Sequence, residues 1–498
     1  MNETFQKLQP YMDKITGLST ALTILNWDLE TLAPKGGVDN TAKAMGSLSG
    51  ELYGTIMNDD VRAILKELES ETDLSEKEKG IVKIWSKEFQ SLEKIPKDEY
   101  QEYSELTAKS GMIWQKAKAA NDYSMFEPYL DKLIDFNKRF AGYRAKEGQK
   151  LYDVLLDDFE EGFTTEKLDE FFAKLKEEIV PLLKAVVVKN NMIDKSYNYR
   201  SFDTKKQDSF NRWIAAYLGF DFNKGVIAES EHPFTTELHN HDVRITTHYY
   251  ENNLESAMFS TIHETGHALY EMGVSDELTQ TLAGGGASMG MHESQSRFFE
   301  NVIGRSEAFW RPIFGRLKAT FFEELKDLSL DNFIKGINKV EPGLIRTEAD
   351  ELTYCLHIMV RYEIEKLIFE GKVTTKELPE LWNAKYEEYL GIRPKTDAEG
   401  ILQDTHWSGG SFGYFPSYAL GNAIAAQLYA YMDKQMDIDE ILRKGEVSKI
   451  VAFLREHIHQ YGKLKKTDDF LMEIMNESFN PTYYVDYLKE KFTRIYEL

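Results

Sequence analysis

The sequence of 498 residues contains a single cysteine, Cys355. One cysteine excludes an internal disulfide and any metal site built from several thiolates, and it fits a reducing compartment such as the cytoplasm. Basic residues are also in the minority, 60 against 83 acidic ones, which gives a formal net charge of −23. This balance argues against a nucleic-acid partner, because binding to a phosphate backbone requires a basic surface.

Long apolar runs are absent as well. The first residues, MNETFQKLQPYMDK, carry too many charges for the hydrophobic part of a secretory signal. The longest stretch without Lys, Arg, Asp or Glu, residues 405–432, includes several glycines, a proline and His406. That composition indicates buried interior and not a membrane span. We therefore expect a cytoplasmic protein without membrane association.

The hydrophobic periodicity indicates helices along most of the chain, and no internal repeat or flexible linker interrupts them. The clearest predicted helices cover residues 61–70, 76–92, 129–143, 164–188, 210–218, 306–328, 330–339, 347–369, 378–390 and 420–432. With 42% hydrophobic residues the chain can bury a large core. These features predict one continuous, mainly α body.

Residues 231–250 differ in character from the helical segments around them. Val243, Ile245 and Thr247 alternate with more polar residues, which is the period-two pattern of a strand. Four histidines also fall here: His232, His239, His241 and His248. The sequence thus predicts a strand near a histidine-rich site, and a strand in that position can offer its edge to an extended peptide.

The next segment, residues 254–270, contains an H-E-x-x-H pattern on an apolar helical repeat. His263 and His267 are four residues apart, so both imidazoles point to one side of the predicted helix. Two imidazoles at this spacing suit a zinc ion, and Glu264 between them can act on a metal-bound water.

A catalytic zinc site requires a third protein ligand. A third histidine at the metzincin spacing is missing, because Tyr270 and Gly273 occupy the positions where that motif has glycine and histidine. The candidate is Glu293, 26 residues after His267 and just beyond a glycine-rich bend at residues 283–291. The alternative for Glu293 is an ordinary glutamate in the first turn of a helix, where the helix dipole favours it.

Six sequence blocks occur in a characteristic order: HPF at 232–234, DVRIT at 242–246, HETGH at 263–267, HESQ at 292–295, IRTEAD at 345–350 and GILQDTHW at 400–407. Together they resemble the carboxypeptidase Taq family of zinc metallocarboxypeptidases. The resemblance implies a mainly α, two-lobed fold with a deep central groove and a small β-sheet beside the zinc site, similar to neurolysin-like and angiotensin-converting-type peptidases. It also implies release of single amino acids from peptide C-termini, with broad specificity, by a homodimer.

On this resemblance the whole chain, residues 1–498, is one peptidase domain. A helical N-terminal lobe would reach to about residue 155, and the catalytic body would begin at about residue 156. His263, His267 and Glu293 would hold one Zn²⁺, although the ligand types also permit Co²⁺.

The resemblance assigns further roles around the metal. Glu264 would be the general base. His406 and Tyr418 would donate hydrogen bonds to the oxyanion, with Tyr414 as the alternative to Tyr418. The other reading of either tyrosine is a core aromatic whose hydroxyl is satisfied internally.

An exopeptidase also has to bind a free carboxylate, which arginine does best. Arg346 is the first candidate for that contact and Arg244 for positioning nearby; the alternatives are ion pairs with Asp350 and Asp242, respectively. Further residues complete the predicted site: Gln403 and Asp404 would close the groove or orient His406, and His232 would touch substrate or support the metal ligands. His239, His241 and His248 are expected to be free of metal, and His457 and His459 to lie at the surface.

Three other functions remain to be separated from a carboxypeptidase. An oligopeptidase of the same fold could release dipeptides, or it could cut internally, which would not require a free C-terminal carboxylate. A non-catalytic zinc scaffold is disfavoured by Glu264, because a structural site has four protein ligands and no use for a base. An acidic helical chaperone is supported by charge and helix content alone.

Overall fold

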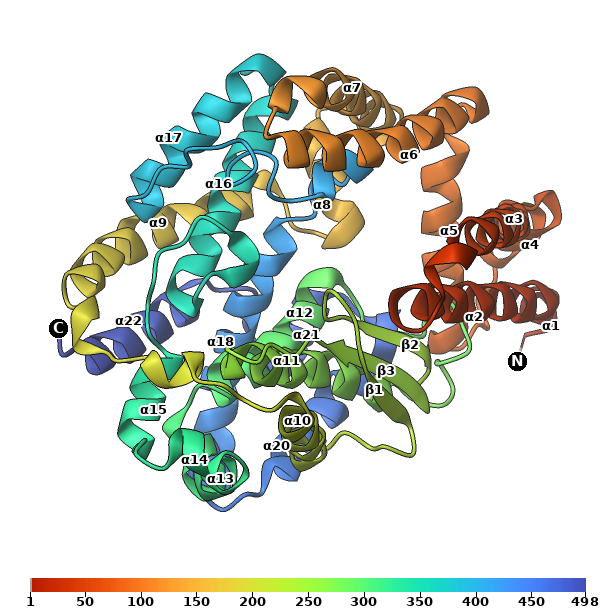
Figure 1. Cartoon of the computed structure of the whole chain (residues 1–498). Helices are drawn as coiled ribbons and strands as arrows, with labels where there is room; N and C mark the ends of the chain where they lie inside the picture. The colour runs from red at the N-terminus through yellow and green to blue at the C-terminus, as the bar shows by residue number, and fades with distance from the viewer. Residues whose placement is uncertain (1) are drawn as a thin grey trace.

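The computed structural model describes residues 2–498, most of which lie in helices (Figure 1). The α-helices are α1 (Glu3–Gln6), α2 (Gln9–Thr31), α3 (Val38–Ile56), α4 (Asp59–Leu68), α5 (Glu76–Glu93), α6 (Lys97–Ala120), α7 (Glu127–Arg144), α8 (Leu151–Phe159), α9 (Thr165–Val188), α10 (Thr204–Leu218), α11 (Leu254–Gly273), α12 (Met289–Arg297), α13 (Glu307–Thr320), α14 (Phe322–Leu325), α15 (Leu330–Ile337), α16 (Glu351–Phe369), α17 (Leu378–Leu390), α18 (Pro416–Met436), α19 (Ile438–Arg443), α20 (Val447–His457), α21 (Thr467–Met475) and α22 (Thr482–Tyr496). Four shorter segments matter below: the π-helix η5 (Phe298–Ile303) and the 3₁₀ segments η6 (Arg346–Glu348), η8 (His406–Gly409) and η9 (His459–Leu464).

Most predicted helices are confirmed, and the differences have local causes. The helix predicted over residues 306–328 is interrupted between α13 and α14, where Phe321 leaves helical geometry and packs edge-to-face on Phe202. The helix predicted from residue 347 starts only at Glu351. Asp350 caps it there by accepting the backbone N–H groups of the next turn, so the preceding residues form η6 instead.

The small sheet contains β1 (Gly225–Glu229), β2 (Thr235–His239) and β3 (Asp242–Thr247) in the order β1-β3-β2. β3 is parallel to β1 and antiparallel to β2. The predicted strand is therefore confirmed as β3, but it lies in the centre of the sheet, where both of its edges are paired. The edge next to the histidine-bearing helix α11 belongs to β2, whose outer side has no partner strand in residues 2–498.

Two groups of buried side chains hold the helices together. The larger one extends from Ala117 to Tyr496 and surrounds α11, α12, α16 and α18. A smaller one joins α1, α2, α4 and α5 and packs on residues 274–283. Figure 1 shows α1–α5 on one side of the molecule. It also shows α11 beside the small sheet. The lobe boundary near residue 155 stays a prediction.

The helix caps mark where the elements of the site begin. Asn253 accepts the backbone N–H of Ser256 and starts α11, and Ser288 does the same for Met291 at the start of α12. Both caps lie directly before the segments that carry the predicted metal ligands. Among residues 2–498, no helix is long and apolar enough to cross a membrane.

Candidate metal centre

The three predicted metal ligands meet between α11 and α12. The Nε2 atoms of His267 and His263 lie 3.6 and 3.9 Å from the same carboxylate oxygen of Glu293. One possible ligand atom from each residue falls within 4.8 Å of the others. Ligands of a tetrahedral zinc ion with bonds of about 2.0–2.1 Å are about 3.3 Å apart, so this donor set fits a single ion with little movement. The histidine side chains are 17% and 15% exposed, so the site opens to solvent.

Two glycines allow Glu293 to reach this position. A Cβ atom on Gly421 of α18 would lie 2.5 Å from the Cγ atom of Glu293. On the other side, a Cβ atom on Gly266 of α11 would lie 2.7 Å from the backbone of Gln295. The absence of both side chains lets α12 pack closely between α11 and α18, which brings its carboxylate to the two imidazoles.

Glu264 is buried on the same helix and is tied to the edge strand. Thr235 of β2 donates its hydroxyl to a carboxylate oxygen of Glu264 at 2.6 Å. Burial raises the pKa of Glu264 above that of an ordinary glutamate, while His263 and the Thr235 hydrogen bond oppose the rise. A carboxylate with a raised pKa beside two candidate metal ligands is suited to taking up a proton.

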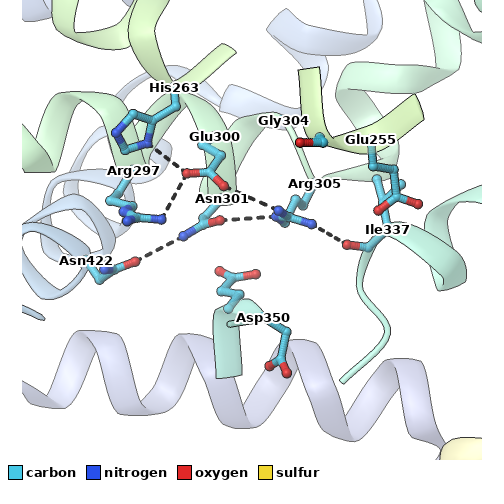
Figure 2. Close-up of polar contacts among 12 residues, drawn as sticks. Glu255, His263, Arg297, Glu300, Asn301, Gly304, Arg305, Ile337, Asp350 and Asn422 are labelled. Atoms are coloured by element: carbon cyan, nitrogen blue, oxygen red, sulfur yellow. Dashed lines mark hydrogen bonds and ion pairs between the residues drawn. The ribbon is translucent and has the colours of Figure 1, made fainter. Parts of the chain in front are cut away.

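Glu300, which the motifs did not identify, fixes the ring of His263. Its Oε2 atom lies 2.8 Å from Nδ1 of His263, and Arg297 donates to the same oxygen at 3.0 Å (Figure 2). Arg305 approaches the other oxygen at 3.3 Å. Glu300 lies in the π-helix, seven residues after Glu293, and this two-turn spacing is the signal that could have predicted it.

Arg297 balances the negative charges of Glu293 and Glu300. Burial alone would raise the pKa of Glu293 and of Glu300, but the guanidinium of Arg297 lies beside both and holds each pKa well below its usual range. Arg297 donates its Nε to Glu293 at 2.7 Å. Both carboxylates are therefore kept ionised, which is the form that a metal ligand and a histidine partner require.

His267 has a different support. Its Nδ1 lies 2.5 Å from Nδ1 of His292, and Nε2 of His292 lies 2.6 Å from a carboxylate oxygen of Glu271. If Nε2 of His267 faces the ion, its Nδ1 must carry the proton and His292 must accept it. His292 then donates from Nε2 to Glu271. His292, directly before Glu293, therefore orients the second histidine ligand.

The predicted oxyanion donors also come together. Nε2 of His406, in η8, lies 3.2 Å from the hydroxyl of Tyr418 at the start of α18. Burial lowers the pKa of His406 to about 4, so its imidazole is neutral near pH 7 and has one N–H to donate. The ring of Tyr414 packs edge-to-face against Tyr418 with 5.2 Å between centroids.

Arg346 has a different partner from the one considered in the sequence. The alternative reading, an ion pair with Asp350, does not form, because Asp350 caps α16 and the guanidinium of Arg346 binds Asp404. Arg346 donates its Nη2 to Asp404 at 2.8 Å and its Nη1 to Tyr354 at 3.2 Å. Arg361, which is fully buried, binds the second oxygen of Asp404.

Gln403 is part of the same buried group. Its carbonyl oxygen accepts from the backbone N–H of Arg346 at 3.0 Å and from Arg361 at 2.8 Å. Its amide donates to the backbone oxygens of Leu344 and Glu399. Gln403 and Asp404 thus hold Arg346 in place.

The remaining predicted residues lie around β2 and β3. Arg244 binds Asp242 through two hydrogen bonds of 2.9 and 2.8 Å and lies over the ring of Trp27. His232 is exposed in the turn before β2.

The surface position predicted for His459 is wrong. The side chain is fully buried and Nε2 lies 2.9 Å from the side-chain oxygen of Gln295. It packs against Gly273 of α11, where any Cβ atom would collide with its ring. His459 lies after the end of α20, at the start of η9. Its burial against α11 depends on tertiary packing, which helical periodicity does not reveal.

A helical body in which an H-E-x-x-H helix meets a carboxylate from the following helix defines a metallopeptidase. The family comparison agrees with this class. The model of the carboxypeptidase Taq (M32) metallopeptidase family matches residues 7–492, so the chain belongs to that family. It is therefore an M32 metallocarboxypeptidase, and the resemblance inferred from the six sequence blocks is confirmed.

Individual relatives support the family assignment along the whole chain. Carboxypeptidase 1 of Bacillus subtilis is 45% identical over 489 residues, which cover 98% of this chain and 97% of the relative. The crystal structure of an M32 carboxypeptidase from Deinococcus radiodurans R1 is 33% identical, with a TM-score of 0.97 and full coverage of both chains.

A more distant likeness concerns the fold alone. A solved structure described as an oligoendopeptidase F is 12% identical, has a TM-score of 0.58, and is matched over 93% of this chain and 86% of its own. The predicted mainly α fold with a small sheet beside the metal site is confirmed, while its division into two lobes stays a prediction.

Proposed function

We propose that this chain is a zinc-dependent carboxypeptidase that removes single amino acids from the C-termini of peptides with broad specificity. The main support for this proposal is that His263, His267 and Glu293 form a candidate metal site. Glu264 lies on the same helix as the two histidines. Three protein ligands leave one position open, which distinguishes a catalytic zinc site from a structural one. Cobalt suits the same ligands and is the expected substitute.

When bound, zinc would lower the pKa of water and polarise the scissile carbonyl. Glu264 then has the proton-transfer role: its carboxylate takes a proton from the attacking water and later gives it to the leaving amine nitrogen. The hydroxyl of Thr235 holds one oxygen of Glu264 and leaves the other for this exchange.

His406 and Tyr418 supply hydrogen bonds to the carbonyl oxygen as it gains negative charge. The imidazole of His406 and the hydroxyl of Tyr418 are 3.2 Å apart, so both can face the same oxygen. This proximity supports Tyr418 over Tyr414 for the role. Removal of one such donor costs about 3–4 kcal/mol of transition-state stabilisation in measured cases.

Arg346 binds the C-terminal carboxylate through the N–H groups that Asp404 and Tyr354 leave free, and Gln403 keeps it in that orientation. A guanidinium has five N–H donors, so the pair with Asp404 does not exhaust it. Arg244 and His232 would contact the peptide near β2. The buried pair with Asp404 makes Arg346 rigid before substrate arrives, which lowers the entropic cost of binding.

The proposal also includes a cytoplasmic location and a homodimer, with the whole chain acting as one peptidase domain. The location is supported by the single, buried Cys355 and the dimer by the family resemblance. Sedimentation equilibrium would test the dimer: a single species near 57.6 kDa, the mass of one chain, would contradict it.

The catalytic proposal is tested with one unstructured peptide prepared as a free acid and as a C-terminal amide. The products are followed by mass spectrometry with and without a chelator. We expect a ladder of single-residue losses from the free acid alone, abolished by the chelator and restored by zinc. Internal fragments from both peptides would show an endopeptidase of the same fold, and dipeptide losses would show a dipeptidase.

A further inference from the structure

A polar cavity separates α2 from the edge strand β2. Its volume is about 210 Å³, and α2 lines it with the hydroxyls of Thr16, Ser19, Thr20 and Thr23 on one helix face. Glu237 of β2 lies on the opposite wall. Ligand pockets for drug-sized molecules span about 300–1,000 Å³, so this cavity has room for a single side chain. Figure 1 shows α2 passing beside β2.

The carboxylate of Glu237 is unpaired. Within residues 2–498 no hydrogen bond or ion pair reaches it. Lys463, an exposed residue, also lines the cavity. Burial and the nearby charge of Glu271 raise the pKa of Glu237 to about 7. A carboxylate in these surroundings gains stability when a cation or hydrogen-bond donor approaches it.

The strand connects this cavity to the catalytic residues. Thr235, which bonds Glu264, and Glu237 are two positions apart on β2, so both side chains point to the same face. Their register partners are Ile245 and Val243 on β3, which pack towards α11. Two strand residues span about 6.6 Å, so Glu237 lies two extended residues from the general base.

The position of the reaction along the peptide decides which residue can reach Glu237. A carboxypeptidase leaves one residue after the scissile bond, and one residue spans at most about 3.6 Å. Only the substrate residues on the N-terminal side of the scissile bond can therefore extend two residues away from the scissile carbonyl and reach Glu237. In an extended peptide the side chain at that distance belongs to the fourth residue from the C-terminus.

We propose that the cavity between α2 and β2 binds a positively charged side chain, lysine or arginine, at the fourth residue from the C-terminus of the substrate. Glu237 forms the ion pair, and the hydroxyls of α2 accept the remaining N–H groups. The proposal rests on the carboxypeptidase function above and adds a preference upstream of the bond, while the C-terminal residue itself stays unrestricted.

The test compares uncharged hexapeptides with variants that carry one lysine or one norleucine, which keeps the four side-chain carbons without the charge, at each position from the second to the fifth from the C-terminus. We expect kcat/KM for lysine over norleucine to rise about tenfold at the fourth position, the size of one hydrogen-bonded charge contact. In Glu237→Gln this ratio should fall to about one. In Lys463→Met, which removes the competing cation, the ratio should increase.

The matched control is Glu229→Gln, which changes an exposed glutamate at the end of β1, on the opposite edge of the same sheet. It should leave the ratio unchanged. A wild-type ratio near one at every position, or a tenfold ratio that survives Glu237→Gln, would overturn the subsite. Failure of the proposed activity is seen separately, because the wild-type protein would then release no C-terminal residue even from the norleucine peptides.

Discussion

The Nδ1 atom of His263 lies 2.8 Å from a carboxylate oxygen of Glu300, and this contact fixes which nitrogen of the ring faces the metal position. Glu300 is in turn held by Arg297 and Arg305 (Figure 2). Residues of the chain itself therefore hold the ring of this metal ligand in a fixed orientation.

Substitution Glu300→Gln should weaken metal binding by about 10–100-fold, because an amide neither attracts the Nδ1–H as strongly nor stays paired with two arginines. Competition with a chelator on the metal-free protein measures the dissociation constant. Glu307→Gln is the control, since Glu307 is 53% exposed and pairs with Arg311 in the next helical turn. Equal affinities in the two variants would show that Glu300 does not position His263.

Glu264→Gln should retain the metal and lose activity. The amide cannot take a proton from water, whereas the three ligand side chains are untouched. The expected loss in kcat is about 10²–10⁴-fold, the contribution of a general base. Elemental analysis and peptide hydrolysis on the same sample provide the measurement. Loss of metal together with activity would contradict the assigned role and point to a structural one.

Arg346→Ala should raise the activation free energy that governs kcat/KM on free-acid peptides by at least about 2 kcal/mol, and any residual cleavage of C-terminally amidated analogues should barely change. The reason is the loss of donors for the terminal carboxylate. Because Arg346 also balances Asp404, thermal unfolding has to be recorded for the same variant. An equal loss on both peptide forms would assign Arg346 to the fold alone.

Gly421→Ala should destabilise the protein by about 1–3 kcal/mol and weaken metal binding, since the added methyl would lie 2.5 Å from the Cγ atom of Glu293. Gly315→Ala on α13 is the matched substitution, because apart from its chain neighbours and its own helix backbone no described atom lies within 4 Å of the new Cβ. It should stabilise its helix by up to about 1 kcal/mol. Denaturant unfolding of both variants compares them, and similar stabilities would contradict the close packing of α12 and α18.

Glu365 makes stability depend on pH. Burial raises its pKa to about 7 against hydrogen bonds from the Gly413 N–H, Trp407 and Tyr152. The folded protein therefore binds more protons than the unfolded chain between about pH 4.3 and 7, and the free energy of unfolding falls as pH rises through that interval.

Glu365→Gln should remove this component, worth up to about 4 kcal/mol. The variant is expected to be less stable overall, because one amide oxygen cannot accept all three donors. The informative quantity is the slope: unfolding of the metal-free proteins at pH 5 and pH 8 should give a smaller difference in the variant. Parallel pH profiles would contradict a raised pKa for Glu365.

The sequence alone determined the parts that depend on short-range pattern. The H-E-x-x-H spacing and the apolar repeat around it predicted α11, and the glycine bend led to Glu293 on the next helix. The order of six blocks predicted the family, which is confirmed. Such features can be read from the chain because a helix fixes the relative direction of residues three or four positions apart.

Only the tertiary structure decided which distant residues meet. Asp404, 58 residues along the chain from Arg346, replaced the nearby Asp350 as its partner. His459 turned out to be buried against α11, and the predicted strand took the centre of the sheet and left the edge to β2. These outcomes depend on how whole helices pack, because a close approach such as that at Gly421 is set by the shapes of three helices at once.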